Sequence, residues 1–392
     1  MPIHTLNKEL MIDTYRPSLG PEELQAVASV FDSRWLGLGP VTEKFECRLA
    51  EFLECKYVVG VGHGTAALHL ALDVLGLAPG DEVIVPSLTF VGSVQAIRMC
   101  AATPVFCEVD PDTLNLDLPD AAARITPRTR AIMPVHFAGL PCDLDPLWET
   151  ARRRGIHVVE DAAHAFGSRY RNHPVGAAGD LVCFSFDTIK NITCGEGGAV
   201  ATNNETWARR IRHRRRLGME MDFEPRTAAE ANWQYQVVSH GFRYHMSDLH
   251  AAIGLVQMEK FSVFQRRKRE IMERYDAAFS ELPGIEVLQH DLETTCPWAC
   301  MLKILDGRRD AFREQLRQKG INTLVQFIPN HLQPAFASGR SNLPVTERLF
   351  GQIVSLPFFA EMTDADVDAV IQAVSVFTKN SACETVCCGF KT

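Results

Sequence analysis

Short apolar runs alternate with helical stretches through the first two-thirds of the 392-residue chain, and this alternation restricts the fold more than any other feature. Strand-like runs occupy residues 56–61, 81–86, 103–110, 129–136 and 156–162. Helical stretches between them cover residues 64–77, 89–100 and 143–155. Such alternation predicts an α/β domain with a mainly parallel sheet, in which ligands bind at the carboxyl ends of the strands.

The pattern changes from about residue 244 onward. A long helical pattern covers 246–282 and is expected to cross from one domain to the next. Strand-like pieces follow, with a helix over 308–320 and a last helix over 363–377. We therefore expect a large domain over 1–255, a smaller C-terminal domain over 256–378, and a mobile tail over 379–392.

Residues 183–200, CFSFDTIKNITCGEGGAV, place a lysine after an apolar strand and before a glycine cluster. The amine of Lys190, if held in a region of low dielectric, loses its proton more readily than a solvated amine. It can then form a Schiff base with an aldehyde. A lysine that merely extends from a strand end into solvent is the plainer interpretation.

The segment VVEDAAHAFGS, at 158–168, places an aspartate at the carboxyl end of another strand. A carboxylate at Asp161 can pair with a protonated pyridine nitrogen, and this pairing makes pyridoxal phosphate (PLP) an electron sink. His164 lies three residues on and could donate to the phenolic oxygen of that cofactor. A helix cap for Asp161 and a core position for His164 are the alternatives.

Gly64 and Thr65 open a helix directly after a strand, which makes their backbone N–H groups a candidate phosphate site. Ser185 could add a hydroxyl to this site, and Phe90 could stack on a cofactor ring. A tight turn is the plainer interpretation of the glycine. The phosphate site, the aspartate and the lysine nevertheless occur in the order that a PLP enzyme requires.

At these motifs the chain resembles the DegT/DnrJ/EryC1/StrS family of PLP-dependent sugar aminotransferases, from about residue 15 to residue 374. The most specific pieces are SRWLGLGPVTEKFE, GDEVIVPSLTFVGSVQAI, MPVHFAGLPCDLDPL, EDAAHAFGS, SFDTIKNITCGEGGAV and GFRYHMSDLHAAIG. VHFAG, EDAAHA and KNITCGEGG are most similar to the branch that forms UDP-4-amino-4-deoxy-L-arabinose. The resemblance implies an aspartate aminotransferase-type (fold type I) α/β architecture, with a mainly parallel seven-stranded sheet and a smaller α+β C-terminal domain.

The resemblance also implies roles for individual residues. Lys190 matches the lysine that forms the internal aldimine and later moves the proton, and Asp161 matches the partner of the pyridinium nitrogen. The remaining cofactor contacts that it implies are the Gly64 backbone, Thr65 and Ser185 at the phosphate, His164 at the ring oxygen and Phe90 stacked on the ring.

The family's activity implies that glutamate or glutamine donates an amine, leaving pyridoxamine phosphate, and that a nucleotide-linked keto sugar accepts it. A homodimer with its active site at the subunit interface is implied as well. A cyclitol ketone or an aminoshikimate-type precursor is an alternative acceptor. A sugar 3-dehydratase is disfavoured, because such relatives carry histidine at the position of Lys190. A non-catalytic ligand-sensing protein on the same fold is the alternative of another class.

Two departures from the family pattern bear on specificity. In GFRYHMSD, Arg243 stands where an asparagine commonly reaches the partner subunit's phosphate, and His245 stands where arginine is common. Arg243 can still bind a phosphate as a bidentate cation. Gln326 replaces a common histidine, and both Gln326 and His331 are expected to face the sugar.

Charge and composition exclude several other classes. Lys and Arg number 40 against 48 Asp and Glu, and the resulting charge of −8 disfavours nucleic-acid binding. No apolar run reaches membrane-spanning length, and the N-terminus lacks a signal-peptide pattern. The twelve cysteines show no metal-binding spacing, so we expect free thiols, no metal and a cytoplasmic location. Six arginines within 209–218 form either a solvated helix face or part of a diphosphate site near the dimer seam.

Overall fold

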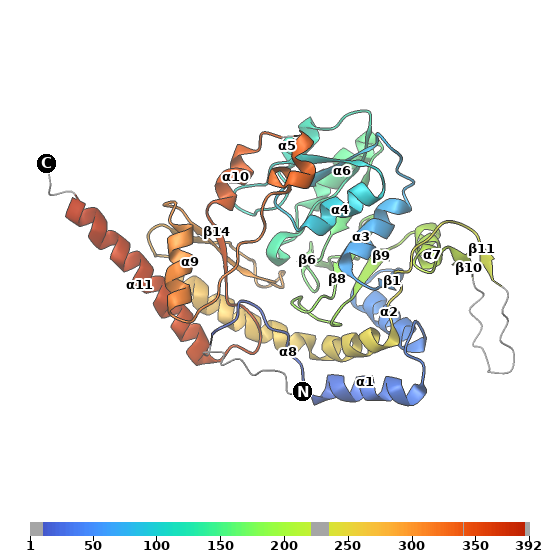
Figure 1. Cartoon of the computed structure of the whole chain (residues 1–392), viewed down its shortest axis with the longest axis horizontal. Coiled ribbons are helices and arrows are strands. Elements are labelled where there is room, and N and C mark those ends of the chain that lie inside the picture. Colours follow the sequence, from blue (N-terminus) through green and yellow to red (C-terminus); the bar gives the residue numbers. More distant parts are fainter. Residues whose placement is uncertain (1–10, 221–234, 340, 389–392) are drawn as a thin grey trace.

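Two main sheets, each with its own apolar core, are connected by one long helix (Figure 1), and a further apolar cluster contains residues from both parts. The computed structural model describes residues 11–220, 235–339 and 341–388. The connecting helix is α8 (Asp248–Phe279), which fulfils the expectation of a helix over 246–282. The expected division after residue 255 falls inside α8, and this boundary stays a prediction.

The larger sheet has seven strands in the order β1-β9-β8-β5-β4-β2-β3. The strands are β1 (Tyr57–Val61), β2 (Glu82–Pro86), β3 (Thr103–Cys107), β4 (Thr129–Ile132), β5 (His157–Asp161), β8 (Leu181–Ser185) and β9 (Gly198–Thr202). Only β9 pairs antiparallel with its neighbours, β1 and β8, and the other adjacent pairs are parallel. The expected mainly parallel, seven-stranded sheet is therefore confirmed.

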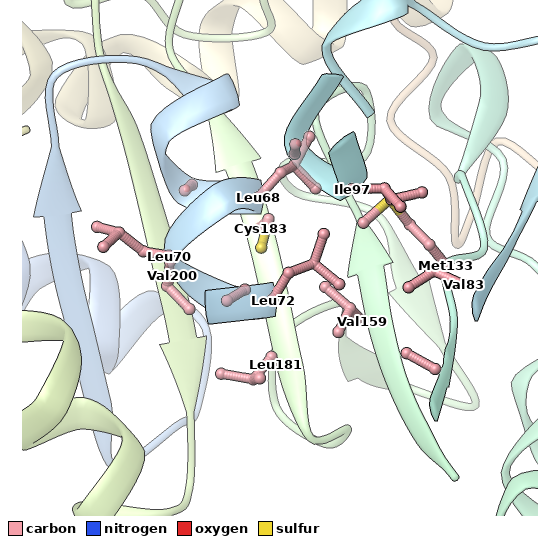
Figure 2. Close-up of a cluster of buried hydrophobic side chains, with 14 of the residues drawn as sticks. Leu68, Leu70, Leu72, Val83, Ile97, Met133, Val159, Leu181, Cys183 and Val200 are labelled. Atoms are coloured by element: carbon pink, nitrogen blue, oxygen red, sulfur yellow. The ribbon is translucent and has the colours of Figure 1, made fainter. Parts of the chain in front are cut away.

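Helices cover both faces of this sheet, and the alternation of side chains along each strand explains why both faces are apolar. The helices in this part of the chain are α1 (Pro21–Ser33), α2 (Pro40–Phe52), α3 (Gly64–Asp73), α4 (Val91–Met99), α5 (Leu118–Ala123), α6 (Leu144–Arg154) and α7 (Glu205–Arg214). Val83 and Val159 pack with α3 and α4, whereas their neighbours Ile84 and Val158 pack with α6 on the opposite face. Figure 2 shows side chains of α3 and α4 packed on the strands of the first face.

The smaller sheet is antiparallel, in the order β12-β13-β14. Its elements and the helices around it are β12 (Ile285–Val287), β13 (Cys300–Ile304), α9 (Arg309–Gln318), α10 (Pro344–Phe350), β14 (Ile353–Leu356) and α11 (Asp364–Cys388). Two-residue strands and short 3-10 turns complete the described chain: β6 (Arg169–Tyr170), β7 (His173–Pro174), β10 (Met219–Glu220), β11 (Gln236–Val237), η1 (Phe137–Gly139), η2 (Asn330–Leu332) and η3 (Pro334–Gly339). The second half of α8 packs with α9 and α11 in the core beside this sheet.

The C-terminal end of the chain differs from expectation, because α11 continues beyond residue 377 to Cys388. The mobility expected of 379–392 stays a prediction, and its last four residues lie outside the described residues. None of the helices in the described ranges combines the length and apolar character needed to cross a membrane.

Asp248, at the start of α8, connects that helix to α2. Its carboxylate is buried and accepts hydrogen bonds from the backbone N–H groups of Gly39, Val41 and Thr42, and from the Thr42 hydroxyl. Gly39 has no side chain that could cap α2, so Asp248 supplies the acceptor for these N–H groups from across the fold.

We expect Asp248→Ala to lower the free energy of unfolding by about 3 kcal/mol, because it leaves several buried donors without an acceptor. Urea unfolding followed by circular dichroism measures this change. Asp32→Ala, at an exposed position in α1, is the matched control and is expected to stay within about 0.5 kcal/mol of the parent. Equal stabilities of the two variants would contradict the role given to Asp248.

Candidate active site

The candidate residues meet at the carboxyl ends of β5 and β8. Asp161 is the last residue of β5 and Ser185 the last of β8, and these parallel neighbours pair in register at Asp161 and Cys183. Lys190 lies in the loop that leaves β8. The structure therefore brings the predicted lysine, aspartate and serine to one edge of the sheet, where an α/β fold binds ligands.

Asp161 is a buried carboxylate with two hydrogen-bond donors. Its Oδ2 accepts from the Ser93 hydroxyl at 2.7 Å, and its Oδ1 accepts from the Ala163 N–H at 3.1 Å. Burial raises the pKa of Asp161 above its usual value, while these two donors and the charge of Lys190 oppose that rise. A cation placed beside Asp161 would therefore be bound strongly, since it would restore the stability of the ionised form.

Small residues allow the N-terminus of α3 to pack closely against the ends of β8 and β9. A Cβ atom on Gly64 would lie 2.8 Å from the Ser185 Cβ, and one on Gly198 would lie 2.8 Å from the Gly64 nitrogen. The N–H groups of Ala66 and Ala67 already reach the His63 carbonyl, which leaves those of Gly64 and Thr65 outermost on α3. The arrangement suits an anion held by backbone N–H groups and the Ser185 hydroxyl.

Lys190 is half-buried, and its amine lies over an aromatic ring. Its Nζ is 4.4 Å from the ring centroid of Trp298. Burial lowers the pKa of Lys190 to about 8, although the carboxylates of Asp161 and Asp187 act in the opposite direction. At pH 7 about a tenth of this amine is therefore unprotonated, far more than of an ordinary lysine, and the unprotonated form is the one that a nucleophile or general base requires.

His164 lies on the same indole ring as Lys190. The rings of His164 and Trp298 are nearly parallel, with centroids 3.7 Å apart. Burial and the charge of Lys190 lower the pKa of His164 well below its usual value, so the ring is neutral. Its Nδ1 is buried and has no hydrogen-bond partner among the described residues, which makes it an orphaned polar atom beside the site.

Phe90 begins α4 and is more than half exposed, at 54%. Its ring centroid lies 5.7 Å from that of Phe327, which in turn lies 6.0 Å from that of His164. Phe90 therefore presents an aromatic surface near the predicted ring contacts, with Phe327 between it and His164.

Gln326 and His331, predicted to face a sugar, both form hydrogen bonds inside the fold. The Gln326 carbonyl oxygen accepts from the hydroxyls of Tyr15 and Ser355. His331 is buried, with Nδ1 2.7 Å from the Ser87 hydroxyl and Nε2 3.2 Å from a Glu347 carboxylate oxygen. This geometry favours a structural role for His331, and the sugar contacts of both residues stay predictions.

Arg243 lies apart from the Lys190 loop, in a cavity of about 260 Å³. The other residues lining this cavity are Trp35, Gly37, Leu38, Arg216, Leu217, Met219 and His245. Arg243 is exposed, and its segment runs beside the end of β1, where the Gly62 N–H donates to the Tyr244 carbonyl. Of the nearby arginines, Arg214 pairs with Asp73 and Arg215 pairs with Glu46, so these two have structural partners.

Three residues at the site were not predicted from the sequence. Ser93 donates to Asp161, Trp298 contacts both His164 and Lys190, and Tyr15 stacks on Trp298 with centroids 5.1 Å apart. Ser93 follows the predicted Phe90 on α4, and that proximity is the one sequence signal for it. Trp298 and Tyr15 are brought in by distant parts of the chain, so no local pattern indicates them.

Comparisons with known proteins show what the whole chain is similar to. The DegT/DnrJ/EryC1/StrS aminotransferase family profile matches residues 17–375. The spore coat polysaccharide biosynthesis protein SpsC of Bacillus subtilis is 38% identical over 375 residues, which cover 93% of this chain and 96% of that protein.

Solved structures are similar over nearly the whole chain. The aminotransferase TlmJ of Streptoalloteichus hindustanus has a TM-score of 0.88 and 36% identity, covering 93% of this chain and 98% of that one. The PLP form of the putative sugar aminotransferase Spr1654 of Streptococcus pneumoniae has a TM-score of 0.88 and 28% identity, covering 94% and 99%. The fold class expected from the sequence is thereby confirmed.

The lowered pKa of Lys190 has a consequence for stability. Below about pH 8 the folded protein must hold a charge that burial disfavours, so the unfolded chain binds more protons and stability rises from about pH 8 to about pH 10. In the cofactor-free protein, we expect Lys190 to contribute about 3 kcal/mol to the rise in the free energy of unfolding over this pH range. Lys190→Met should lack this contribution.

Urea unfolding of the cofactor-free parent and Lys190→Met, repeated across this pH range, measures the difference. Lys44→Met, at an exposed position in α2, is the control and should leave the pH dependence of the parent intact. A constant difference in stability between parent and Lys190→Met at all pH values would show that Lys190 does not titrate as argued.

Proposed function

The chain belongs to the DegT/DnrJ/EryC1/StrS aminotransferase family, and on this premise we propose that it transfers an amino group from glutamate or glutamine to a nucleotide-linked keto sugar. It is an aminotransferase, and its cofactor is pyridoxal phosphate. The observation that carries the proposal is the meeting of the Lys190 amine and the Asp161 carboxylate at one sheet edge, beside the open N-terminus of α3.

The residues present fit this cofactor on three points. The backbone N–H groups at the start of α3, brought close to Ser185 because Gly64 has no side chain, suit its phosphate. The buried carboxylate of Asp161 suits its pyridinium nitrogen, and the unpartnered Nδ1 of His164 suits its ring oxygen. The exposed ring of Phe90 is available for stacking.

Each of these residues has a chemical task in amino transfer. Bound PLP supplies an electron sink for the charge that develops at the substrate carbon. Asp161 keeps the pyridine nitrogen protonated, and Ser93 holds Asp161 in place. Lys190, with a pKa of about 8, takes a proton at Nζ and returns it near neutral pH.

The sugar as acceptor is supported by relatives. SpsC is named for polysaccharide biosynthesis, and Spr1654 is described as a putative sugar aminotransferase. The nucleotide, and the likeness to the UDP-4-amino-4-deoxy-L-arabinose branch, rest on the sequence motifs. A cyclitol ketone or an aminoshikimate-type precursor would use the same Lys190 and Asp161, so these acceptors belong in the same test.

A homodimer in the cytoplasm completes the proposal. The cavity at Arg243 lies away from the Lys190 loop, and its rim carries exposed apolar side chains, among them Trp35 and Leu217. A second copy of the chain seated on this surface would cover these side chains and place Arg243 toward the partner's phosphate site.

The first test is the absorbance spectrum with added PLP. We expect a yellow band that L-glutamate or L-glutamine bleaches, and that the acceptor ketone restores when nucleotide keto sugars and cyclitol ketones are tried in turn. Lys190→Ala should abolish the band, and Asp161→Asn should keep it but slow the bleaching on the order of a hundredfold. A band that neither amino acid bleaches would contradict the proposed donors, and a missing band would revive the non-catalytic alternative.

Arg243→Ala should weaken retention of PLP about tenfold, because a charge-assisted hydrogen bond to phosphate is lost. Equilibrium dialysis measures the affinity, and Arg209→Ala, at an exposed position in α7, is the control. In a mixed dimer of one Arg243→Ala subunit and one Lys190→Ala subunit, one site combines an intact Lys190 with the intact Arg243 of the partner. This site should therefore regain the affinity and activity of the parent. Unchanged affinity in Arg243→Ala would refute the phosphate contact, and a mixed dimer without recovery would refute its delivery to the partner.

A further inference from the structure

Trp298 contacts the site at three points although it comes from a distant part of the chain, just before β13, and packs in an apolar cluster shared by the two parts of the molecule. It follows the 290–297 loop that leads into β13 and is 2% exposed. Its ring stacks on His164, carries the Lys190 amine 4.4 Å from its centroid, and donates through Nε1–H to the Ile189 carbonyl at 2.8 Å. It therefore holds both the side chain of Lys190 and the backbone next to it.

A second aromatic ring, that of Tyr15, also holds the indole ring in place. Tyr15 stacks on Trp298 at an interplanar angle of 10° and donates its hydroxyl proton to Gln326. The planes of Tyr15, Trp298 and His164 are thus nearly parallel. A buried aromatic ring fixed on several sides has little freedom to turn, so it presents its face to the amine at a constant place.

The face of an indole attracts cations more strongly than that of any other aromatic side chain, and the attraction grows when water is excluded. The groups that otherwise act on the Lys190 amine are the carboxylates of Asp161 and Asp187 and the neutral ring of His164. Both carboxylates favour the ammonium, and burial opposes it. Trp298 adds a favourable contact that carries no charge of its own and so cannot form an ion pair with the amine.

We propose that Trp298 is a positioning residue that holds the free ammonium of Lys190 on its ring whenever that amine is not bonded to the cofactor. This inference rests on the proposed function, since a lysine is released during amino transfer only if it was bound before. Trp298 stabilises the protonated amine and keeps it within reach of Asp161 and His164. The amine therefore does not swing into solvent or occupy the place of the incoming substrate.

The test measures the pKa of the Lys190 amine in the cofactor-free protein. Trace labelling with acetic anhydride across a pH series, followed by mass spectrometry of the Lys190 peptide, gives this value. We expect the pKa to fall in the order parent, Trp298→Phe, Trp298→Leu, by about one unit overall. The control is Trp148→Phe, which changes a tryptophan of α6 that packs on Tyr170. This variant should leave the pKa of Lys190 unchanged.

Fluorinated tryptophan separates the contribution of the ring face to the pKa of Lys190 from the contributions of packing and of the Nε1–H hydrogen bond. Fluorine weakens the ring's attraction for cations and retains its shape, so each added fluorine should lower the pKa of Lys190 in the parent chain. All five tryptophans are replaced in such a protein, and therefore the same series is made in Trp298→Phe, where no trend is expected. A Lys190 pKa that is the same in all variants, or a fluorine trend that persists in Trp298→Phe, would overturn the inference.

A parallel measurement of PLP binding distinguishes a failure of this inference from a failure of the proposed function. If the parent and Trp298→Leu both form the yellow band and share one Lys190 pKa, the inference fails and the proposed function stands. If the parent forms no band, the proposed function fails, and the role of the released amine fails with it. A band in both variants, together with the expected order of pKa values, supports the two proposals jointly.

Discussion

The burial of one amine beside one carboxylate is the constraint on which the rest of the site depends. Removing Lys190 and Asp161 from water is costly for both, as the lowered pKa of the lysine and the raised pKa of the aspartate show. The fold offsets part of this cost with a hydroxyl and a backbone N–H on Asp161 and an aromatic ring under the amine. In the proposed function, a cationic ring bound at Asp161 would relieve the remaining cost, so the site would favour its cofactor.

Residues of α8 and of the segment after it take part in holding this arrangement. Asn191, next to Lys190, donates to the carbonyls of Phe166 and Cys296 and accepts from the buried Lys268 of α8 at 2.7 Å. The Lys190 loop is therefore fastened by residues before, within and after α8, besides its own strand. A displacement of α8 or of the segment around Cys296 would move this loop, so the packing of these segments affects the position of Lys190.

The sequence allowed prediction of those parts that local patterns encode. Strand–helix alternation predicted the sheet, and the lysine-glycine and aspartate segments predicted which strand ends would meet, since β5 and β8 each end in a motif. Local patterns could not identify Trp298 as a site residue, because its contact with Lys190 arises from packing between distant parts of the chain. The sequence also did not indicate the partners of His331, whose two ring nitrogens lie against Ser87 and Glu347; its predicted sugar contact stays a prediction.

A comparison of Lys190 with Lys268, the other lysine whose pKa burial lowers strongly, explains why Lys190 is the better suited to proton transfer. Burial lowers the pKa of Lys268 to about 7, with the Cys296 thiol as the opposing group, and its amine is committed to Asn191. Burial also lowers the pKa of Lys190, but two carboxylates raise it again, to about 8, and its amine faces an aromatic ring that binds it without a hydrogen bond. A base must release its proton and move. Of these two lysines, Lys190 is the one whose amine forms no hydrogen bond with the described residues, so it is the freer to do so.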